Sequence, residues 1–317
     1  LPISPVAHPL SIEVMARHDI IIAKRSPVAD GVLDDPALRA VLISRNGVGL
    51  DHLDLDACSR AGLMISTTPG SARRATAGAA ATLLLSCAHR VIEKDALVRR
   101  GDWQHRHQIQ GTGLQGKMLG LIGAGNVGQE ILALMAPWGM RYAIASPRKT
   151  EAEAAAIGAE LLPLEELFRQ ADFLVLACQL SDETRHLVNS RTLALMKPDA
   201  ILINVARGGV LDEAALFDAL SNGRLRSAGL DVFDPEPPSP DNPLFGLGNV
   251  VLSPHGMGFS DESNRIGNQL AARNALAVSR GEAPDNLVNP DALEHPRVRA
   301  FLTRRKEMMR ALGHASD

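Results

Sequence analysis

The sequence predicts an α/β protein whose larger part is a parallel, doubly wound sheet. Short apolar runs that suit buried strands alternate along the chain with stretches of helical periodicity. One of these runs, at residues 117–128, reads KMLGLIGAGNVG and leads through closely spaced glycines into a helical pattern. The chain has 317 residues, more than one typical core accommodates, so two domains are expected.

The apolar run at residues 118–122 is too short for a helix between breakers and suits a buried parallel strand. The turn after it has G-x-G-x-x-G spacing and consists of Gly123, Ala124, Gly125, Asn126, Val127 and Gly128. Such a turn lets backbone N–H groups approach a pyrophosphate at a helix N-terminus. By spacing alone, an ordinary glycine-rich turn explains the motif equally well. The flanking strand and helix favour dinucleotide binding.

Further strands of this sheet are predicted at residues 141–145, 173–177, 200–205, 227–232 and 250–252. Parallel sheets of this kind bind ligands at the carboxyl ends of their strands. The glycine turn is therefore expected at the same edge as Arg207, Asp231 and His255. Taken singly, each of these three side chains could serve an ordinary loop or surface role. Their joint placement at strand ends favours a functional interpretation.

The N-terminal part predicts a smaller unit, with strands at residues 19–23, 38–44 and 63–66. A glycine loop at residues 45–51 follows the second strand, and its N–H groups could hold a small anion or form a plain turn. Pro69-Gly70 indicates a hinge before a buried helix at residues 75–88. Residues 264–317 are helical by pattern and are expected to return to this first unit.

Composition argues against several classes of function. The net charge of −3 gives no electrostatic footprint for nucleic acid, and one Tyr and two Trp offer little base stacking. No apolar run approaches the ~20 residues of a membrane span, and no signal peptide is visible. Three widely spaced cysteines are expected to be reduced core residues of a cytoplasmic protein. No metal site is predicted.

Several separate motifs then point to one family. They are ISRNGVGLDHLDL at 43–55, ILINVARGGVLDEAAL at 201–216, AGLDVFDPEP at 228–237, LSPH at 252–255 and NLVNP at 286–290. With the mid-chain glycine motif, they resemble the D-isomer-specific 2-hydroxyacid dehydrogenase family over about residues 38–290. The resemblance implies a Rossmann-type dinucleotide-binding domain, residues 71–263, inserted into a smaller flavodoxin-like substrate domain, residues 1–70 and 264–317. It also implies a homodimer that uses the helix near residues 91–103.

The resemblance implies hydride transfer between a nicotinamide cofactor and a small 2-oxo or 2-hydroxy acid, such as glyoxylate or hydroxypyruvate. His255 would be the general acid/base, with Glu236 fixing its tautomer and favouring the imidazolium. Arg207 would pair with the substrate's carboxylate and carbonyl. The remaining residues would bind substrate or cofactor: the N–H groups of Val48 and Gly49 would hold the substrate's carboxylate, Asp231 would accept from the nicotinamide carboxamide, and Thr76 and Val205 would lie near the cofactor.

The residue after the second strand of the dinucleotide-binding domain predicts whether the cofactor is NAD or NADP. NAD enzymes place an acid there for the ribose 2′-hydroxyl, about 20 residues past the glycine motif. Here that position is Ser146, followed closely by Arg148 and Lys149. A hydroxyl and two cations would accept a 2′-phosphate that a carboxylate repels, so NADP is expected, with NAD also possible.

Other departures from the family pattern lie at Gly78, Gln179, Met257 and Phe259. Met257 and Phe259 follow His255 and could reshape the pocket or fill space. Two other classes of function also stay open: a different oxidation on the same fold, such as that of phosphite or formate, and a non-catalytic, corepressor-like dinucleotide sensor. Formate-type members usually pair the histidine with Gln, so Glu236 argues against that chemistry.

Overall fold

The structure is a computed structural model of the 317-residue chain, and it describes residues 9–312. The chain divides into two compact units. Unit 1 comprises Leu1–Ala72 and Ser260–Asp317, and unit 2 comprises Arg73–Phe259. Each unit contains a parallel sheet with helices, as the α/β prediction requires.

Unit 2 is built on a seven-stranded sheet, in the order β10-β9-β8-β7-β4-β5-β6, in which every neighbouring pair is parallel. Its strands are β4 (Met118–Ile122), β5 (Arg141–Ala145), β6 (Glu160–Leu161), β7 (Phe173–Leu176), β8 (Ile201–Asn204), β9 (Ser227–Leu230) and β10 (Val250–Leu252). From β4 the chain adds strands on one side as far as β6, then crosses to add β7 to β10 on the other. The strand order therefore reverses between β4 and β7, where doubly wound sheets bind ligands.

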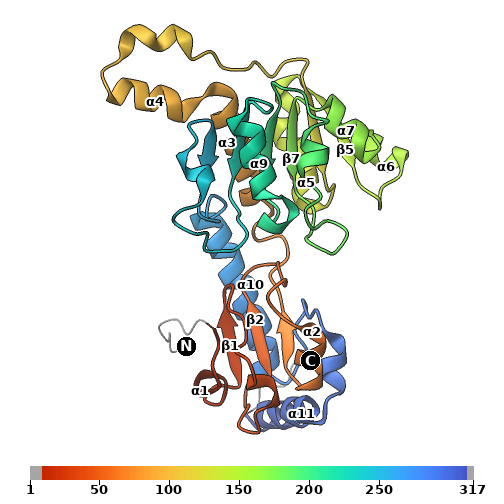
Figure 1. Ribbon diagram of the computed structural model, residues 1–317. Helices are drawn as coiled ribbons and strands as arrows, with labels where there is room; N and C mark the ends of the chain where they lie inside the picture. Colours follow the sequence, from red (N-terminus) through yellow and green to blue (C-terminus); the bar gives the residue numbers. More distant parts are fainter. Residues whose placement is uncertain (1–8, 313–317) are drawn as a thin grey trace. The chain divides into compact units, whose positions relative to one another are not determined.

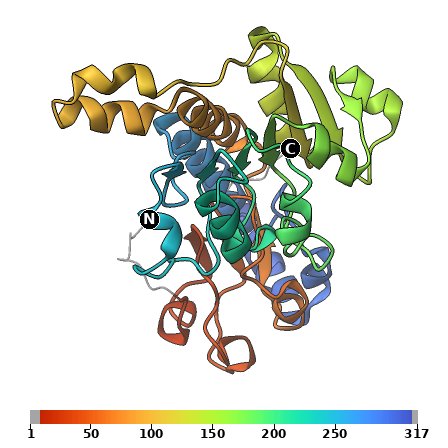
Figure 2. The same ribbon diagram turned by 45° about the horizontal axis from the view of Figure 1, so that its top comes forward.

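Helices cover both faces of this sheet (Figures 1 and 2). They are α3 (Arg73–His89), α4 (Val91–Arg99), α5 (Asn126–Met135), α6 (Glu151–Ala156), α7 (Leu164–Gln170), α8 (Ser190–Leu193) and α9 (Glu213–Ser221), with the 3-10 turns η2 (Trp103–Gln108), η3 (Ala136–Trp138), η4 (Gly208–Val210) and η5 (Pro243–Gly246). Helix α3 contains the buried helix predicted at residues 75–88, and its alanines and leucines pack with α5 against one face. The opposite face is covered by a second apolar cluster that includes side chains of α7 and α9.

Unit 1 is built on a three-stranded parallel sheet in the order β1-β2-β3. Its elements are α1 (Ile12–Met15), β1 (Ile20–Ala23), η1 (Val32–Asp34), β2 (Leu42–Arg45), α2 (Leu55–Arg60), β3 (Met64–Ser66), α10 (Asp261–Ser279), η6 (Pro290–Glu294) and α11 (Pro296–Ala311). The strand expected from residue 38 begins only at Leu42. The N–H groups of Arg39 and Ala40 donate to the carbonyl of Met15 and not to a neighbouring strand.

The segment at residues 286–290 joins the two halves of unit 1. Asn289 accepts from the N–H of Ile65 at 2.7 Å and donates through Nδ2 to the carbonyl of Leu63 at 2.9 Å. Leu287 forms an antiparallel bridge with Ser66, beside β3. A buried amide thus satisfies backbone groups from a strand more than two hundred residues away in sequence.

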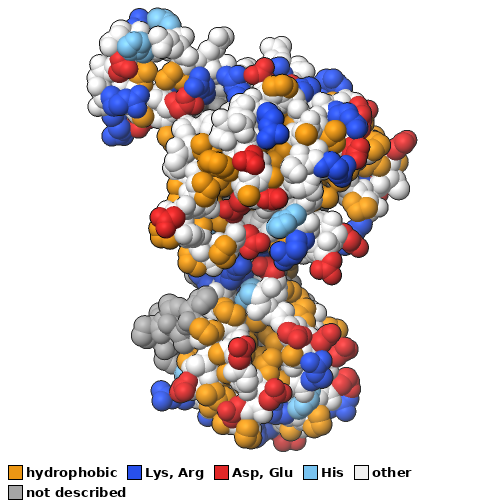
Figure 3. All heavy atoms as spheres, viewed as in Figure 1, with side chains coloured by type: hydrophobic (Ala, Val, Ile, Leu, Met, Phe, Trp, Pro, Cys, Tyr) orange, Lys and Arg blue, Asp and Glu red, His pale blue; other side chains and the backbone are white. Residues whose placement is uncertain are grey.

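Among residues 9–312, no single helix is long and apolar enough to cross a membrane, and α3 and α4 satisfy the same criteria only as a pair bent by 58°. Figure 3 shows acidic and basic side chains interspersed over the visible face of each unit.

Candidate functional site

The glycine turn between β4 and α5 has the geometry of a site for a large anionic group. A Cβ on Gly123, whose φ is +96°, would lie 2.7 Å from the backbone of Cys178, and a Cβ on Gly128 would overlap the carbonyl oxygen of Gly123. Gly125 differs, because a Cβ there would meet nothing within 4 Å. Gly125 is the N-cap of α5, and no side chain among residues 9–312 caps this N-terminus. The turn therefore offers free space beside uncapped helical N–H groups, which fits a pyrophosphate.

The predicted cofactor-selecting residues lie beside this turn. Ile122 and Ala145 are paired in register, and the N–H of Gly123 donates to the carbonyl of Ala145, so Ser146 begins next to the glycine turn. Lys149 is already ion-paired with Glu153 at 3.1 Å, whereas Arg148 is exposed and has no hydrogen bond or ion pair within residues 9–312.

His255 and Glu236 meet at the carboxyl edge of the same sheet. His255 follows β10, and its Nδ1 lies 2.8 Å from Oε2 and 3.0 Å from Oε1 of Glu236. Oε1 of Glu236 also accepts from the N–H of Phe233 at 3.2 Å. The side chain of Glu236 is 16% exposed and that of His255 is 35% exposed. This arrangement leaves Nε2 as the ring nitrogen that can face a substrate.

Asp231 has a structural contact that the sequence did not predict. It is 6% exposed, and its Oδ1 accepts from the N–H groups of Gly256 and Met257 at 3.0 and 3.2 Å. These are the two residues after His255, which itself has a φ of +51°. The carboxylate at the end of β9 therefore holds the loop that carries the histidine. Sequence offers little signal for such a contact, because any residue supplies the N–H groups.

Arg207 follows β8, and hydrogen bonds to both its backbone and its guanidinium position it, including one from Nη1 to the carbonyl of Ala206 at 2.7 Å. Asn204 donates to the carbonyl of Arg207 at 3.0 Å and accepts from the N–H of Ala206 at 3.0 Å. A Cβ on Gly208 would overlap the carbonyl group of Phe233, so the loops after β8 and β9 lie directly against each other. Asn204 was not among the predicted residues, although an Asn at the end of a strand signals such a turn.

The other predicted residues of unit 2 lie close to the same loops. Val205 is buried, and its N–H donates to the carbonyl of Leu176 at the end of β7. Thr76 lies in the first turn of α3, and a Cβ on Gly258 would come within 3.5 Å of its backbone nitrogen. Unit 2 thus gathers the glycine turn, Arg207, Asp231, Glu236 and His255 at the carboxyl edge of one sheet.

Val48 and Gly49 belong to unit 1, where they follow β2. The loop is held by Gly47, whose N–H donates to Oγ1 of Thr68 at 2.8 Å and whose carbonyl accepts from the N–H of Thr68 at 3.1 Å. Thr68 is fully buried, while Val48 is 51% exposed. Unit 1 therefore presents this loop at the carboxyl edge of its own sheet. Among residues 9–312, no group of three or more His, Cys, Asp or Glu could hold a metal ion.

Similar proteins of known family identify the family of this chain. The family model described as D-isomer specific 2-hydroxyacid dehydrogenase, NAD binding domain, matches residues 81–256. A glyoxylate reductase from Thermococcus litoralis is 39% identical over 289 residues, covering 89% of this chain and 87% of its own. A glyoxylate reductase from Thermococcus gammatolerans is 41% identical over 284 residues, covering 87% and 84%.

Solved structures extend the likeness to the fold. A protein from Thermus thermophilus superposes with a TM-score of 0.79 at 36% identity, covering 87% of this chain and 89% of its own. An NADPH-dependent glyoxylate/hydroxypyruvate reductase from Sinorhizobium meliloti gives a TM-score of 0.77 at 28% identity, with 87% of each chain covered. The chain therefore belongs to the D-isomer-specific 2-hydroxyacid dehydrogenase family, whose members work with a nicotinamide dinucleotide.

Proposed function

We propose that this protein transfers hydride reversibly between NADP(H) and a small 2-oxo/2-hydroxy acid of the glyoxylate or hydroxypyruvate type. The observation that carries the proposal is the His255–Glu236 pair at 2.8 Å, at the edge of the sheet that also carries the glycine turn. The substrate class is supported by the relatives, which are named glyoxylate reductases.

In the proposed reduction, each site residue has a distinct chemical role. The bound cofactor supplies the hydride that the substrate carbon receives. His255 donates a proton from Nε2 to the new hydroxyl and takes it back in the oxidation. Glu236, bonded to Nδ1, stabilises the imidazolium from which that proton comes. Arg207 pairs with the substrate's carboxylate and carbonyl, and the N–H groups of Val48 and Gly49 bind the carboxylate.

The activity is tested by assaying 2-oxo acids, phosphite and formate with both cofactors. We expect turnover of 2-oxo acids, and His255→Ala should abolish it while cofactor binding, followed by cofactor fluorescence, persists. Because alanine is strained at a φ of +51°, His255→Asn serves as a second variant, since Asn tolerates this backbone conformation better. Full activity in both variants contradicts the assignment. Cofactor binding by the wild type with no turnover of any substrate favours the sensor.

NADP preference is proposed from Ser146, Arg148 and Lys149. A hydroxyl in place of the usual acid removes the charge that repels a 2′-phosphate, and Arg148 has no partner within residues 9–312 that would compete for its guanidinium. The measurement is kcat/KM with NADPH and with NADH. An equal or higher value with NADH contradicts the preference.

A homodimer is proposed through α4 and η2. Figures 1 and 2 show this segment extending away from the rest of unit 2. It exposes large apolar side chains, namely Val91, Ile92, Val98 and Trp103, each 47–61% exposed. Exposed apolar surface of this kind favours a protein partner. Light scattering should give a dimeric mass for the wild type and for Leu312→Glu, a control in unit 1, and a monomeric mass for Val98→Glu. A monomeric wild type contradicts the proposal.

A cytoplasmic location is proposed from the cysteines. Cys58, Cys87 and Cys178 form no disulfide, and burial raises the pKa of the Cys58 and Cys87 thiols to about 11. Buried, protonated thiols of this kind suit a reducing compartment. Cell fractionation tests the location, and recovery outside the cytoplasm contradicts it.

A further inference from the structure

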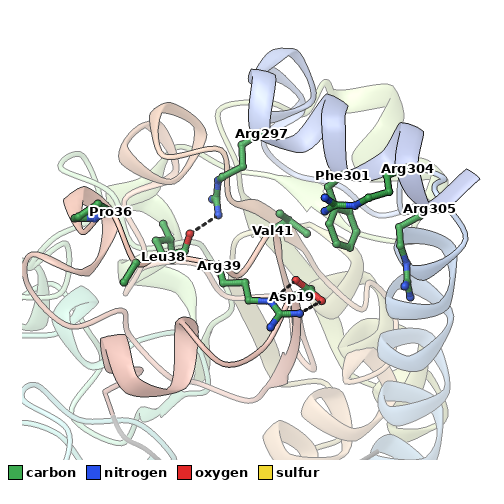
Figure 4. Close-up of a pocket in the computed structure, with 10 residues that line it drawn as sticks. Asp19, Pro36, Leu38, Arg39, Val41, Arg297, Phe301, Arg304 and Arg305 are labelled. Carbon is green, nitrogen blue, oxygen red and sulfur yellow. Dashed lines mark hydrogen bonds and ion pairs between the residues drawn. The ribbon is translucent and has the colours of Figure 1, made fainter.

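Unit 1 contains a cavity of about 670 Å³ that none of the catalytic proposals uses. One wall is α11, and the other consists of residues that precede β1 and β2 (Figure 4). The lining residues are Asp19, Pro36, Ala37, Leu38, Arg39, Val41, Arg297, Phe301, Arg304 and Arg305. A volume of this size is typical of sites for small molecules, which occupy about 300–1,000 Å³.

The cavity lies at the opposite edge of the sheet from the glycine loop at residues 45–51. Asp19 and Val41 immediately precede β1 and β2, whereas Val48 and Gly49 follow β2. The four residues of β2 separate the two places by about 13 Å along the strand. The cavity is therefore a separate feature of unit 1.

The lining is strongly basic. It contains four arginines and a single acid, Asp19, which leaves a formal excess of three positive charges. Arg39 forms a bidentate pair with Asp19 at 2.7 and 2.9 Å, and this pairing holds the pKa of the carboxyl below its usual value. Arg304 and Arg305 lie close enough to Asp19 to lower its pKa further, but the single carboxylate is hydrogen-bonded to Arg39 and cannot balance four cations.

Arg297 is committed to the fold through backbone groups. Its guanidinium donates to the carbonyls of Leu38, Ala61 and Gly62 at 2.7–2.9 Å. These acceptors are neutral, and burial lowers the pKa of Arg297. A half-buried cation with neutral partners creates a positive potential inside the cavity, which an anion would offset.

Arg304 and Arg305 have guanidinium N–H groups that are available to donate hydrogen bonds to a ligand. Their guanidinium carbons lie 5.9 and 5.8 Å from the centre of the Phe301 ring, so both cations are held on one aromatic side chain. Arg305 donates only Nε, to the carbonyl of Ser279, and Arg304 has no hydrogen bond or ion pair within residues 9–312. Two like charges on one ring repel each other, and a shared anion would relieve that repulsion.

We propose that this cavity binds a small organic molecule with at least two anionic groups, carboxylate or phosphate. Arg304 and Arg305 would hold the anionic groups through their open N–H donors, with Arg297 adding positive potential. Leu38, Val41 and Phe301 would contact the apolar part of the molecule. The proposal goes beyond the dehydrogenase function and does not depend on it.

The test is isothermal titration of the full chain, with the glycine turn of unit 2 already saturated with NADP⁺, using inorganic pyrophosphate and, separately, succinate. The double variant Arg304→Gln/Arg305→Gln should weaken binding about tenfold or more, because it removes charge-assisted hydrogen bonds. Arg310→Gln is the matched control, since it removes the same charge from an exposed position on α11 outside the cavity. The anion that binds more tightly identifies the ligand as a phosphate or a carboxylate.

Hydrogen exchange of α11 provides a local readout. Saturating anion should slow exchange at residues 297–305 in the wild type and in Arg310→Gln, and leave it unchanged in the double variant. Three results would each overturn the proposal: no binding of either anion, equal affinity in all three proteins, or binding that chloride reproduces at the same ionic strength. None of these measurements involves turnover, so failure here is distinct from failure of the proposed reaction.

Discussion

Two carboxylates hold His255, one through its ring and one through the residues that follow it. Glu236 binds Nδ1, while Asp231 binds the N–H groups of the two following residues. The left-handed backbone at His255 is tolerated because these contacts fix the loop around it. Orientation of the ring therefore depends on the buried carboxylate of Asp231 and the partly buried carboxylate of Glu236 as much as on the histidine itself.

Replacing Glu236 with Gln should separate charge from geometry. Glutamine has a similar size, but it lacks the negative charge that stabilises the imidazolium. We expect kcat/KM for 2-oxo acid reduction to fall about 100-fold at neutral pH, and part of the activity to return as the pH is lowered. The pH profile is the measurement, with the exposed Glu183→Gln as control. A profile of unchanged shape would assign Glu236 a purely structural role.

Arg148 and Lys149 should contribute unequally to cofactor choice. The ammonium group of Lys149 already pairs with Glu153, whereas the guanidinium of Arg148 has no partner within residues 9–312. Arg148→Gln should therefore lower kcat/KM with NADPH by about tenfold and leave NADH turnover nearly unchanged. Lys149→Gln should have a smaller effect. A loss shared equally by both cofactors would rule out contact with the 2′-phosphate.

At the level of elements, the turn between β4 and α5 contains two glycines with different structural requirements. Gly128 has no room for a Cβ, whereas Gly125 faces open space. Gly128→Ala should destabilise unit 2 by about 2 kcal/mol or more, because the new methyl group overlaps the strand end. Gly125→Ala should change stability by about 1 kcal/mol or less and still weaken cofactor binding about tenfold, by blocking approach to the helical N–H groups.

Both variants can be followed by tryptophan fluorescence during urea unfolding. The chain has two tryptophans, and Trp103 and Trp138 both lie in unit 2, so the signal reports on this unit alone. Cofactor titration of the folded proteins gives the second quantity. If Gly125→Ala bound cofactor like the wild type, the space in front of α5 would not be the pyrophosphate site.

The start of β7 should make unit 2 sensitive to acid. Partial burial opposes ionisation of Asp172, but the N–H of Met118 and the ammonium groups of Lys197 and Lys117 outweigh it and hold the pKa of the carboxyl below its usual value. This stabilisation is present above the unfolded carboxyl pKa of about 4 and is lost as the pH falls through the lower, folded value.

Asp172→Asn should therefore cost about 1–3 kcal/mol of unfolding free energy at pH 7, since a hydrogen-bonded charge is lost. The difference from wild type should shrink as the pH falls below about 4. Urea unfolding at several pH values measures it. Asp199→Asn, at a side chain 87% exposed, should change little at any pH. A difference that stayed constant with pH would show that the charge of Asp172 does not stabilise the fold.

The local sequence pattern predicted the main helices and strands, but it could not predict contacts between segments that are distant in the sequence. The strand–glycine–helix unit at residues 118–135 is visible in sequence because its spacing is local. The late start of β2 at Leu42 depends on the carbonyl of Met15, and the basic cavity requires α11 to lie against residues 19–41. Neither contact leaves a periodic trace, because each joins segments remote from each other in the chain. The contact of Asp231 with the loop after β10 could not be predicted for a different reason: its partners are backbone amides, which every residue type except proline supplies.

At the scale of the whole molecule, unit 1 is assembled from two separated stretches of chain. Ile65 and Asn289, which are hydrogen-bonded, lie 224 positions apart in sequence. All of unit 2 lies between them, and its two ends come together, since a Cβ on Gly258 would lie 3.5 Å from the backbone of Thr76. Once unit 2 has folded, the effective separation between Ile65 and Asn289 falls from 224 residues to roughly 40, which lowers the entropy cost of closing that loop by about 1.5 kcal/mol.

From the adjacency of Thr76 and Gly258 we expect unit 2 to fold before unit 1. Unit 2 emerges whole during synthesis, whereas β1, β2 and β3 of unit 1 gain their contacts with α10 and the segment at residues 286–290 only after unit 2 has been made. In refolding, tryptophan fluorescence should recover before the amides of β3 gain protection in pulse-labelled hydrogen exchange. Simultaneous recovery would show that the two units fold as one. Any mutation that slows the folding of unit 2 should therefore also delay the folding of unit 1, although it changes no residue of unit 1.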